Sequence, residues 1–366
     1  MLRKTWWRWS QVLSNEWKGR RHRQVHFVTD SADWSFKWDA HYIAGGLGQC
    51  LHDDVPIITT PWHLRHQVIL FGNRYPWFFG PRRTLHRSNT LFLTWFHGSP
   101  DDPDERMRAM FEQLPQALDP MVGIIVTCDI SRRVLLDHGI GSDKLFTIPL
   151  GVDLKLFCPP TPEEKNKIRA DLGIPEGVFC IGSFQKDGTG WGEGTVPKLV
   201  KGPDVFLEAL ARTTIPKGRL LVLLTGPARG YVKNGLDRLG ISWRHRFVEN
   251  YPDIVACYQA LDAYVIASRA EGGPKALVES WACGVPVLST RVGMPADRIG
   301  NGVNGWMVDV EDSQGLAHAL DALFEQPELR QACRTGGLEA VRLLDWSHVV
   351  QGYHSVIGHA VNRVKT

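Results

Sequence analysis

The sequence lacks several features that would place it in a specialised class of protein. No stretch approaches the roughly 20 consecutive apolar residues that a membrane-spanning helix needs. No apolar core of a signal peptide stands near the first residue either. The seven cysteines are scattered and never form a Cys-x-x-Cys pair, which argues against a zinc site or a disulfide framework. We therefore expect free thiols in a reducing cytoplasm.

A strong excess of one charge sign is missing as well. The formal net charge is +3 over 366 residues, which does not by itself indicate a nucleic-acid partner. Apolar and charged residues occur in the proportions of an ordinary globular protein. Because the chain is too long for one typical hydrophobic core, we expect two domains.

Residues 1–23 are an exception to this even charge. They carry seven arginine or lysine residues against a single acid, Glu16, with four tryptophans interleaved. A basic, Trp-rich segment is typical of a peripheral anchor on an anionic membrane surface. A solvated arm whose tryptophans pack on the first domain would show the same pattern, so the sequence leaves both interpretations open.

Short apolar strands alternate with helical segments through the first part of the chain. The pattern predicts strands at residues 24–29, 55–59, 67–71, 91–96, 123–127 and 144–149, and helices at 31–51, 104–116 and 131–138. Such alternation favours a mostly parallel sheet with helices on both faces. We expect Gly45, Gly46 and Gly48 to close the first helix, because they come too late after the strand for a phosphate-binding loop.

A second α/β unit begins with the apolar run at residues 178–182. Further strands are expected at 220–225, 263–267 and 285–290, with helices at 275–283 and 349–364. The most informative stretch lies between two of these strands, and it reads Glu271-Gly-Gly-Pro-Lys-Ala-Leu-Val-Glu279.

The chemistry of this stretch suits a ligand that carries both phosphate and hydroxyl groups. Its glycines let the backbone approach a ligand and present free amides. The helix that should begin at Pro274 adds a partial positive charge, which can hold an anion. Two carboxylates, Glu271 and Glu279, can accept hydrogen bonds from hydroxyl groups, so a nucleotide sugar fits. A plain strand–turn–helix with a solvated Glu279 is the alternative.

Taken with the segments that follow it, this stretch resembles a known donor-binding region. Gly284-Val-Pro-Val287 comes next, and Asn301-Gly302 and Asn304-Gly305 come later. The combination resembles retaining glycosyltransferases of the GT-B fold, in particular glycosyltransferase family 4 (group 1), which carry E-G-[GF]-x-x-x-x-x-E, then A-x-G-x-P-V and N-G. Residues 149–160 resemble the link between the two domains of that family. The resemblance covers the second domain almost entirely and the first only in outline.

The resemblance implies an α/β fold of the GT-B type. Two Rossmann-like domains with parallel sheets would face each other across a cleft, and a C-terminal helix would cross back to the first domain. The implied segments are an arm at 1–23, an acceptor-side domain at 24–155, a donor domain at 156–345, and a helix at 346–366 that packs on the N-terminal domain.

The implied activity is a metal-independent, retaining hexosyl transfer that needs no added cofactor. The partners would be a UDP- or GDP-linked sugar donor and a glycan or glycolipid precursor in polysaccharide biosynthesis, with no nucleic acid. The protein would be cytoplasmic, and it would sit on the inner face of the membrane if residues 1–23 bind anionic lipid. A nucleotide-sugar epimerase or hydrolase on the same fold, and a non-catalytic nucleotide-sugar-binding protein, stay open as alternatives.

His97 and Glu271 are the expected catalytic residues. His97 follows an apolar strand, at the end where open α/β sheets bind ligands. The resemblance places its imidazole at the reaction centre and places Glu271 on the donor sugar. A capping or core histidine is the alternative for His97, since the chain contains 14 histidines.

The expected donor-binding residues come from two stretches of the second domain. Lys201-Gly202 matches the second half of a G-R-x…K-G element whose cations grip the diphosphate, whereas Ser183 stands where Arg is common. Lys186 is therefore the expected substitute cation. Residues 187–194, between them, form either a lid or a plain surface loop. The other stretch supplies the remaining members of the set, which are Gly272, Gly273, Lys275 and Glu279, the last on the ribose hydroxyls.

No metal ligand is expected. An Asp-x-Asp sequence, which holds a divalent ion in GT-A glycosyltransferases, does occur as Asp102-Pro103-Asp104. Here the acidic residues 101–105 precede a helical run and resemble an N-cap with an acidic first turn. Lysines and a helix N-terminus can neutralise a departing diphosphate instead.

Overall fold

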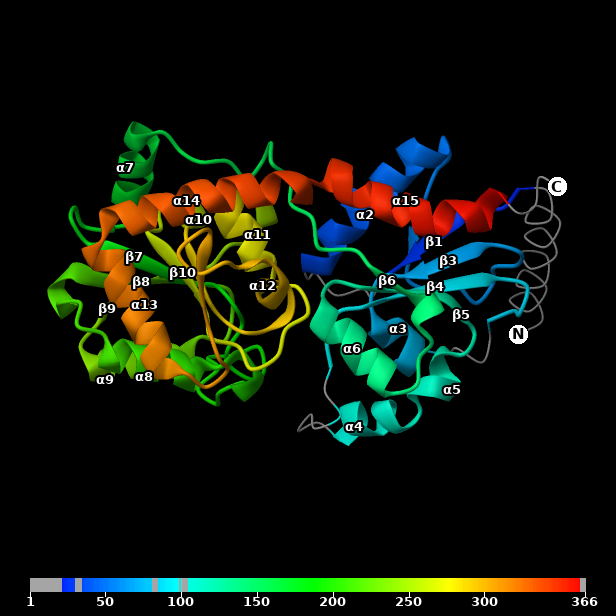
Figure 1. The fold of residues 1–366 in the computed structure, drawn as a ribbon, viewed down its shortest axis with the longest axis horizontal. Helices are drawn as coiled ribbons and strands as arrows, with labels where there is room; N and C mark the ends of the chain where they lie inside the picture. Colours follow the sequence, from blue (N-terminus) through cyan, green and yellow to red (C-terminus); the bar gives the residue numbers. More distant parts are fainter. Residues whose placement is uncertain (1–21, 30–34, 81–84, 99, 101–104, 363–366) are drawn as a thin grey trace. The chain divides into compact units, whose positions relative to one another are not determined.

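The computed structural model describes residues 22–29, 35–80, 85–98, 100 and 105–362. The chain separates into two compact units, the first formed by Met1–Gly151 with Trp346–Thr366 and the second by Val152–Asp345 (Figure 1). Nearly all of the basic, Trp-rich arm lies outside the described residues, so its membrane role stays a prediction. No helix in the described part of the chain is both long and apolar enough to cross a membrane.

The first unit is built on a six-stranded parallel sheet with the order β2-β1-β3-β4-β5-β6. Its strands are β1 (Val25–Val28), β2 (Ile57–Ile58), β3 (Val68–Phe71), β4 (Thr90–Trp95), β5 (Met121–Val126) and β6 (Leu145–Thr147). Val68 and Leu70 pack into one core, whereas Ile69 and Phe71 pack into the core on the opposite face. The period of two in a strand requires this, and it buries the sheet on both sides.

Four short helices cover one face of this sheet, and they are α3 (Arg74–Phe79), α4 (Glu105–Glu112), α5 (Leu114–Leu118) and α6 (Asp129–Asp137). The prediction of one helix at 104–116 is wrong in its described part, because α4 and α5 are separate. Pro115 lies in the first turn of α5 and has no N–H to continue the hydrogen bonding of α4.

The other face is covered by α2 (Ser35–Leu51) and α15 (Trp346–Asn362), which lie side by side (Figure 1). The prediction that Gly45, Gly46 and Gly48 close α2 is wrong, since the helix continues to Leu51. Gly46 lets α15 approach closely, because a Cβ atom there would lie 2.6 Å from a methyl group of Val350. The C-terminal helix thus packs on the first unit, as the predicted fold requires.

The second unit has a six-stranded parallel sheet with the order β12-β11-β10-β7-β8-β9. Its strands are β7 (Phe179–Ser183), β8 (Leu220–Thr225), β9 (Ser242–Arg246), β10 (Ala263–Ile266), β11 (Val287–Thr290) and β12 (Gly305–Val308). From β7 the chain proceeds outward to β9 and then returns to β10 on the other side of β7. Open α/β sheets bind ligands at the carboxyl ends of the strands where the order reverses, which here are β7 and β10.

Helices cover both faces of the second sheet (Figure 1). The core on one face contains α8 (Pro203–Arg212), α9 (Gly230–Leu239) and α13 (Ser313–Glu325). The opposite face carries α10 (Ile254–Gln259) and α11 (Lys275–Ala282). The remaining helices are α7 (Pro162–Asp171), α12 (Gly293–Arg298) and α14 (Pro327–Val341). The two parallel sheets with their helical layers confirm the predicted α/β class.

Candidate functional site

Lys201 and Glu271 meet beyond the carboxyl ends of β7 and β10. The Lys201 Nζ atom lies 2.6 Å from Oε1 of Glu271, and the Ser268 hydroxyl donates to the same oxygen at 2.9 Å. The side chains of Lys201 and Glu271 are 20% and 9% exposed, so the ion pair is only partly screened by water. An ammonium group has three donors, and this pair leaves N–H groups of Lys201 for a ligand.

Gly202 brings Lys201 against the end of β10. Its φ of +61° lies in the left-handed region, and a Cβ atom there would come within 1.8 Å of the carbonyl oxygen of Ala267. No other residue fits both requirements, because a side chain would strain the backbone and displace the strand end. The Lys-Gly dipeptide is thus explained by geometry, with the cation beside the backbone approach that glycine permits.

The backbone of Gly272 and Gly273 forms the start of the loop that leads into α11. Within the described chain, neither N–H of these glycines donates a hydrogen bond to another protein group. The loop is attached to α12, since the Met294 N–H donates to the Gly272 carbonyl at 2.8 Å. The helix begins at Lys275. Pro274 is therefore the N-cap residue and not, as predicted, the first helical residue. Two free amides and a helix N-terminus therefore lie next to Glu271.

Glu279 is buried within α11, with only 3% of its surface exposed. The Tyr258 hydroxyl donates to its Oε2 atom at 2.7 Å, and the Tyr251 hydroxyl donates to Oε1. Burial raises the pKa of Tyr258 well above its usual value, and the charge of Glu279 raises it further, so the phenol remains a donor. The interpretation of Glu279 as a solvated helix residue is wrong. Lys275 lies nearby, with Nζ 4.9 Å from the centre of the Tyr251 ring.

Lys186 directly precedes the glycine-rich segment, residues 187–194, and is not part of the Lys201–Glu271 pair. Its Nζ atom is 3.8 Å from the centre of the Trp191 ring, and partial burial lowers its pKa. The preceding residue, Gln185, donates from Nε2 to the carbonyl of Lys201 at 3.1 Å. The two stretches predicted to carry the diphosphate-binding cations are therefore adjacent in the structure.

A buried arginine fastens the start of the glycine-rich segment, and the sequence pattern did not reveal it. Arg229 donates to both carboxylate oxygens of Asp187 at 3.0 and 2.9 Å, and to the carbonyls of Ser183 and Thr225. Its side chain and that of Asp187 are 0% and 1% exposed. Arg229 follows β8, more than 40 residues from Asp187, so no local spacing points to the pair.

The far end of this segment is also held in place. The Gly194 carbonyl accepts from the Tyr231 N–H at 2.9 Å, and the Glu193 carbonyl accepts from the Gly230 N–H at 2.6 Å. Trp191, at the tip, is 67% exposed. We therefore expect any lid-like movement of residues 187–194 to involve mainly the tip around Trp191.

The other predicted residues have separate positions. His97 is half-buried and lies two residues after Trp95, the last residue of β4 in the first unit, as expected for a residue at the carboxyl edge of a sheet. Asp102 and Asp104 lie outside the described residues. Among the described residues, no group of three or more His, Cys, Asp or Glu side chains could hold a metal ion. Asn304 has a structural role within one loop. Its Oδ1 atom accepts from the Gly300 N–H, and its Nδ2 atom donates to the Arg298 carbonyl.

The region that holds this site matches a known family. Residues 197–339 match the family model described as "Glycosyl transferases group 1". The match supports a glycosyltransferase of group 1. It includes Lys201, Glu271 and Glu279, and it ends before α15.

Curated relatives carry a related description. The D-inositol 3-phosphate glycosyltransferase of Thermobifida fusca is 28% identical over 295 residues, which are 77% of this chain and 64% of that protein. D-inositol 3-phosphate glycosyltransferase 1 of Catenulispora acidiphila is 29% identical over 248 residues, 64% of this chain and 56% of that protein. The chain thus spans less than two thirds of the length of these two relatives.

Solved structures share the fold at low sequence identity. HepE of Anabaena in complex with UDP and glucose gives a TM-score of 0.73 at 18% identity and covers 92% of this chain and 100% of its own. Sucrose-phosphate synthase of Thermosynechococcus elongatus gives a TM-score of 0.74 at 16% identity. The match covers 92% of this chain and 99% of the synthase chain. These likenesses, with the two parallel sheets, confirm the predicted GT-B fold.

Proposed function

We propose that this protein is a retaining glycosyltransferase of family 4 that transfers a hexose from a UDP- or GDP-linked sugar to a glycan or glycolipid precursor. The observation that carries the proposal is the contact between Lys201 and Glu271 at the carboxyl ends of β7 and β10. A cation for phosphate and a carboxylate for hydroxyls lie side by side there, next to the free amides of Gly272 and Gly273. The group 1 family match and the UDP complex of HepE support a nucleotide-sugar donor.

The proposed donor contacts follow from these positions. Lys201, with the helix N-terminus that follows Pro274, would neutralise the diphosphate. Glu271 would order the hydroxyl groups of the sugar, together with Gly272 and Gly273. Glu279 would accept from the ribose hydroxyls with the carboxylate that Tyr251 and Tyr258 orient.

Two further lysines complete the proposed donor site. Lys275 opens α11, where its ammonium group would add to the positive potential of the helix N-terminus. Lys186 would stabilise the diphosphate from the position just before the glycine-rich segment, with its side chain against the Trp191 ring. The assignment of His97 to the reaction centre stays a prediction.

The transfer itself exchanges one bond at the anomeric carbon for another. The bond from that carbon to the phosphate oxygen breaks, and its electron pair leaves with the nucleoside diphosphate. The acceptor oxygen forms its bond on the same face, and its proton passes to a phosphate oxygen of the leaving group. The products are a glycoside of unchanged anomeric configuration and a free nucleoside diphosphate. Stabilising the charge that develops on the leaving group lowers the barrier most.

A phosphorylated polyol is a specific acceptor candidate. The curated relatives are described as D-inositol 3-phosphate glycosyltransferases. We therefore include inositol phosphate beside lipid-linked and free glycans among the acceptors to be tested.

Nucleotide release with and without acceptor tests the proposal against its alternatives. Full-length protein is incubated with UDP- and GDP-sugars, with EDTA present, and free UDP or GDP is measured. We expect release that requires an acceptor and a product whose anomeric configuration, read from proton NMR couplings, matches that of the donor. Acceptor-independent release would indicate a hydrolase, and a changed sugar without release would indicate an epimerase. Binding without turnover of any donor would indicate a non-catalytic protein.

A further inference from the structure

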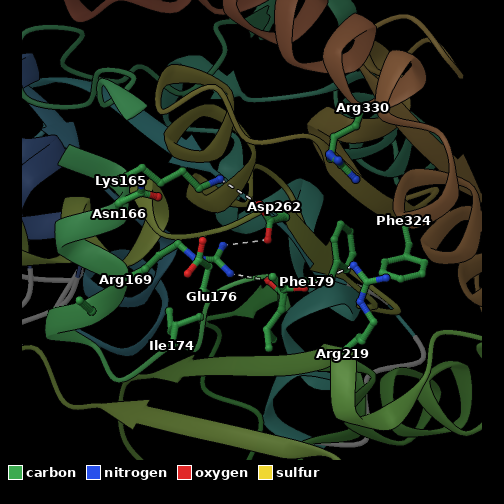
Figure 2. A pocket seen from close by; sticks show the side chains of 13 residues that line it. Lys165, Asn166, Arg169, Ile174, Glu176, Phe179, Arg219, Asp262, Phe324 and Arg330 are labelled. Atoms are coloured by element: carbon green, nitrogen blue, oxygen red, sulfur yellow. Dashed lines mark hydrogen bonds and ion pairs between the residues drawn. The ribbon is translucent and has the colours of Figure 1, made fainter. Parts of the chain in front are cut away.

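A cavity of about 600 Å³ lies at the opposite edge of the second sheet (Figure 2). Phe179 begins β7, while Arg219 and Asp262 directly precede β8 and β10, and all three line the cavity. Because the strands are parallel, this is the amino edge of the sheet, whereas Glu271 follows a carboxyl end. The volume falls within the range of small-molecule sites.

The lining of this cavity is predominantly cationic. Four cations (Lys165, Arg169, Arg219 and Arg330) line it with only two acids (Glu176 and Asp262). These side chains come from α7, α14 and the loops that precede β7, β8 and β10, so distant parts of the sequence meet there. A small anion in the cavity would be attracted by an excess of positive charge and would bridge these segments.

The positive charge of one half of the lining is partly compensated. Lys165 Nζ and Arg169 Nη1 lie 2.9 Å from the two carboxylate oxygens of Asp262. Burial raises the pKa of Asp262, but these two cations outweigh it and hold the pKa below its ordinary value. Asp262 therefore remains ionised and offsets one of the two positive charges beside it.

The other half lacks an acidic partner. Arg219 donates to the Gly177 carbonyl at 3.5 Å, and Arg330 donates to the Leu323 carbonyl at 2.6 Å. No carboxylate of the described chain pairs with either guanidinium group. Each guanidinium has five N–H donors, so both keep donors for a ligand.

Two aromatic rings fix the directions of these guanidinium groups. Arg219 lies 5.1 Å from the centre of the Phe324 ring, and Arg330 lies 5.7 Å from that of Phe179. The two rings pack edge to face, with their centres 5.6 Å apart. Figure 2 shows both arginines and both rings on the same side of the cavity. Held in this way, the guanidinium groups lose little conformational entropy when they bind an anion.

We infer that this cavity is a second binding site, for a small phosphate-bearing ligand. The planar fork of arginine matches two phosphate oxygens, and arginine pairs with phosphate more strongly than with neutral acceptors. The Phe179 and Phe324 rings give an apolar surface to the organic part of the ligand. The site is separate from the proposed donor site and does not depend on the proposed activity.

Phenyl phosphate is the probe for this site, with binding measured by isothermal titration calorimetry at constant ionic strength. Full-length Lys201→Ala protein is used, so that binding at the proposed donor site does not contribute. We expect saturable binding with one ligand per chain. Adding Arg219→Ala and Arg330→Ala should weaken it at least tenfold, whereas Arg238→Ala, which removes a charge from the exposed end of α9, should leave it unchanged.

Folding of each variant is checked by its thermal midpoint. If Arg330→Ala disturbs α14, the single change Arg219→Ala, at an exposed position, takes the place of the double change and should still weaken binding measurably. Equal affinity in the doubly substituted protein, or an equal loss in Arg238→Ala, would overturn the inference. Sedimentation with phosphatidic acid vesicles then identifies the source of the phosphate. Dependence of that binding on Arg219 and Arg330 would indicate a lipid headgroup, and binding of phenyl phosphate alone would indicate a soluble metabolite.

Discussion

Lys201 serves two partners in the proposed enzyme, and its position explains how. Its ammonium group is paired with Glu271 before any ligand binds, which keeps the long side chain in one place. A donor diphosphate then meets a cation that is already positioned, so little side-chain entropy is lost on binding. The same charge would stabilise the leaving group in the transition state.

Replacement of Lys201 by alanine should therefore affect both binding and rate. We expect the Kd for the nucleoside diphosphate to rise about tenfold, and kcat to fall by about a hundredfold, because the cation contacts ground state and leaving group alike. Calorimetry and steady-state kinetics measure the two effects separately. Lys201→Arg, which keeps the charge, should recover part of the loss. A variant that lost only stability, with normal Kd and kcat, would show that the ion pair is purely structural.

At this scale the sequence predicted residue types better than their partners. Glu271 and Lys201 were both selected, because a glycine-flanked carboxylate and a Lys-Gly dipeptide are local patterns. Tyr251 and Tyr258 were missed, since their contacts with Glu279 depend on how the chain folds over 20 residues or more. Long-range hydrogen bonds of this kind have no signature in a single sequence.

At the scale of elements, apolar strands were predicted well and polar or broken elements were not. β8 is continuously apolar, and its predicted and observed bounds agree. β9, with the sequence Ser-Trp-Arg-His-Arg, lies at the edge of its sheet and alternates between exposed and half-buried residues, so its strand was not predicted. The glycines of α2 misled the prediction because the helix continues past all three to Leu51, and one of them, Gly46, serves helix packing.

The glycine-rich segment offers a test of how an element is anchored. Arg229→Met would leave the carboxylate of Asp187 buried and unpaired, so we expect a loss of about 3–5 kcal/mol in the free energy of unfolding. Urea denaturation measures this. Adding Asp187→Asn to that variant should recover part of the loss, because the uncompensated charge is gone. A loss below about 1 kcal/mol for Arg229→Met would mean that the pair contributes little to stability.

At the scale of the whole molecule, the strand order of the second sheet determines where the proposed donor site lies. Its reversal between β7 and β10 brings Lys201 and Glu271 together, although 70 residues separate them in the sequence. The alternation of strands and helices predicted the α/β class, and the resemblance supplied the GT-B type. No sequence pattern indicated the cavity at the amino edge, because its arginines come from segments without any shared motif.

The most direct test of the proposed function is the turnover of Glu271→Gln in the full-length protein. This change keeps the shape of the side chain and removes the charge that would order the sugar hydroxyls and hold Lys201. Glu339→Gln, at an exposed position of α14, is the matched control. With the best donor and acceptor, we expect kcat of Glu271→Gln to fall at least a hundredfold, with a thermal midpoint within about 4 °C of the wild type. The control should retain full activity, and near-wild-type turnover by Glu271→Gln would contradict the proposed site.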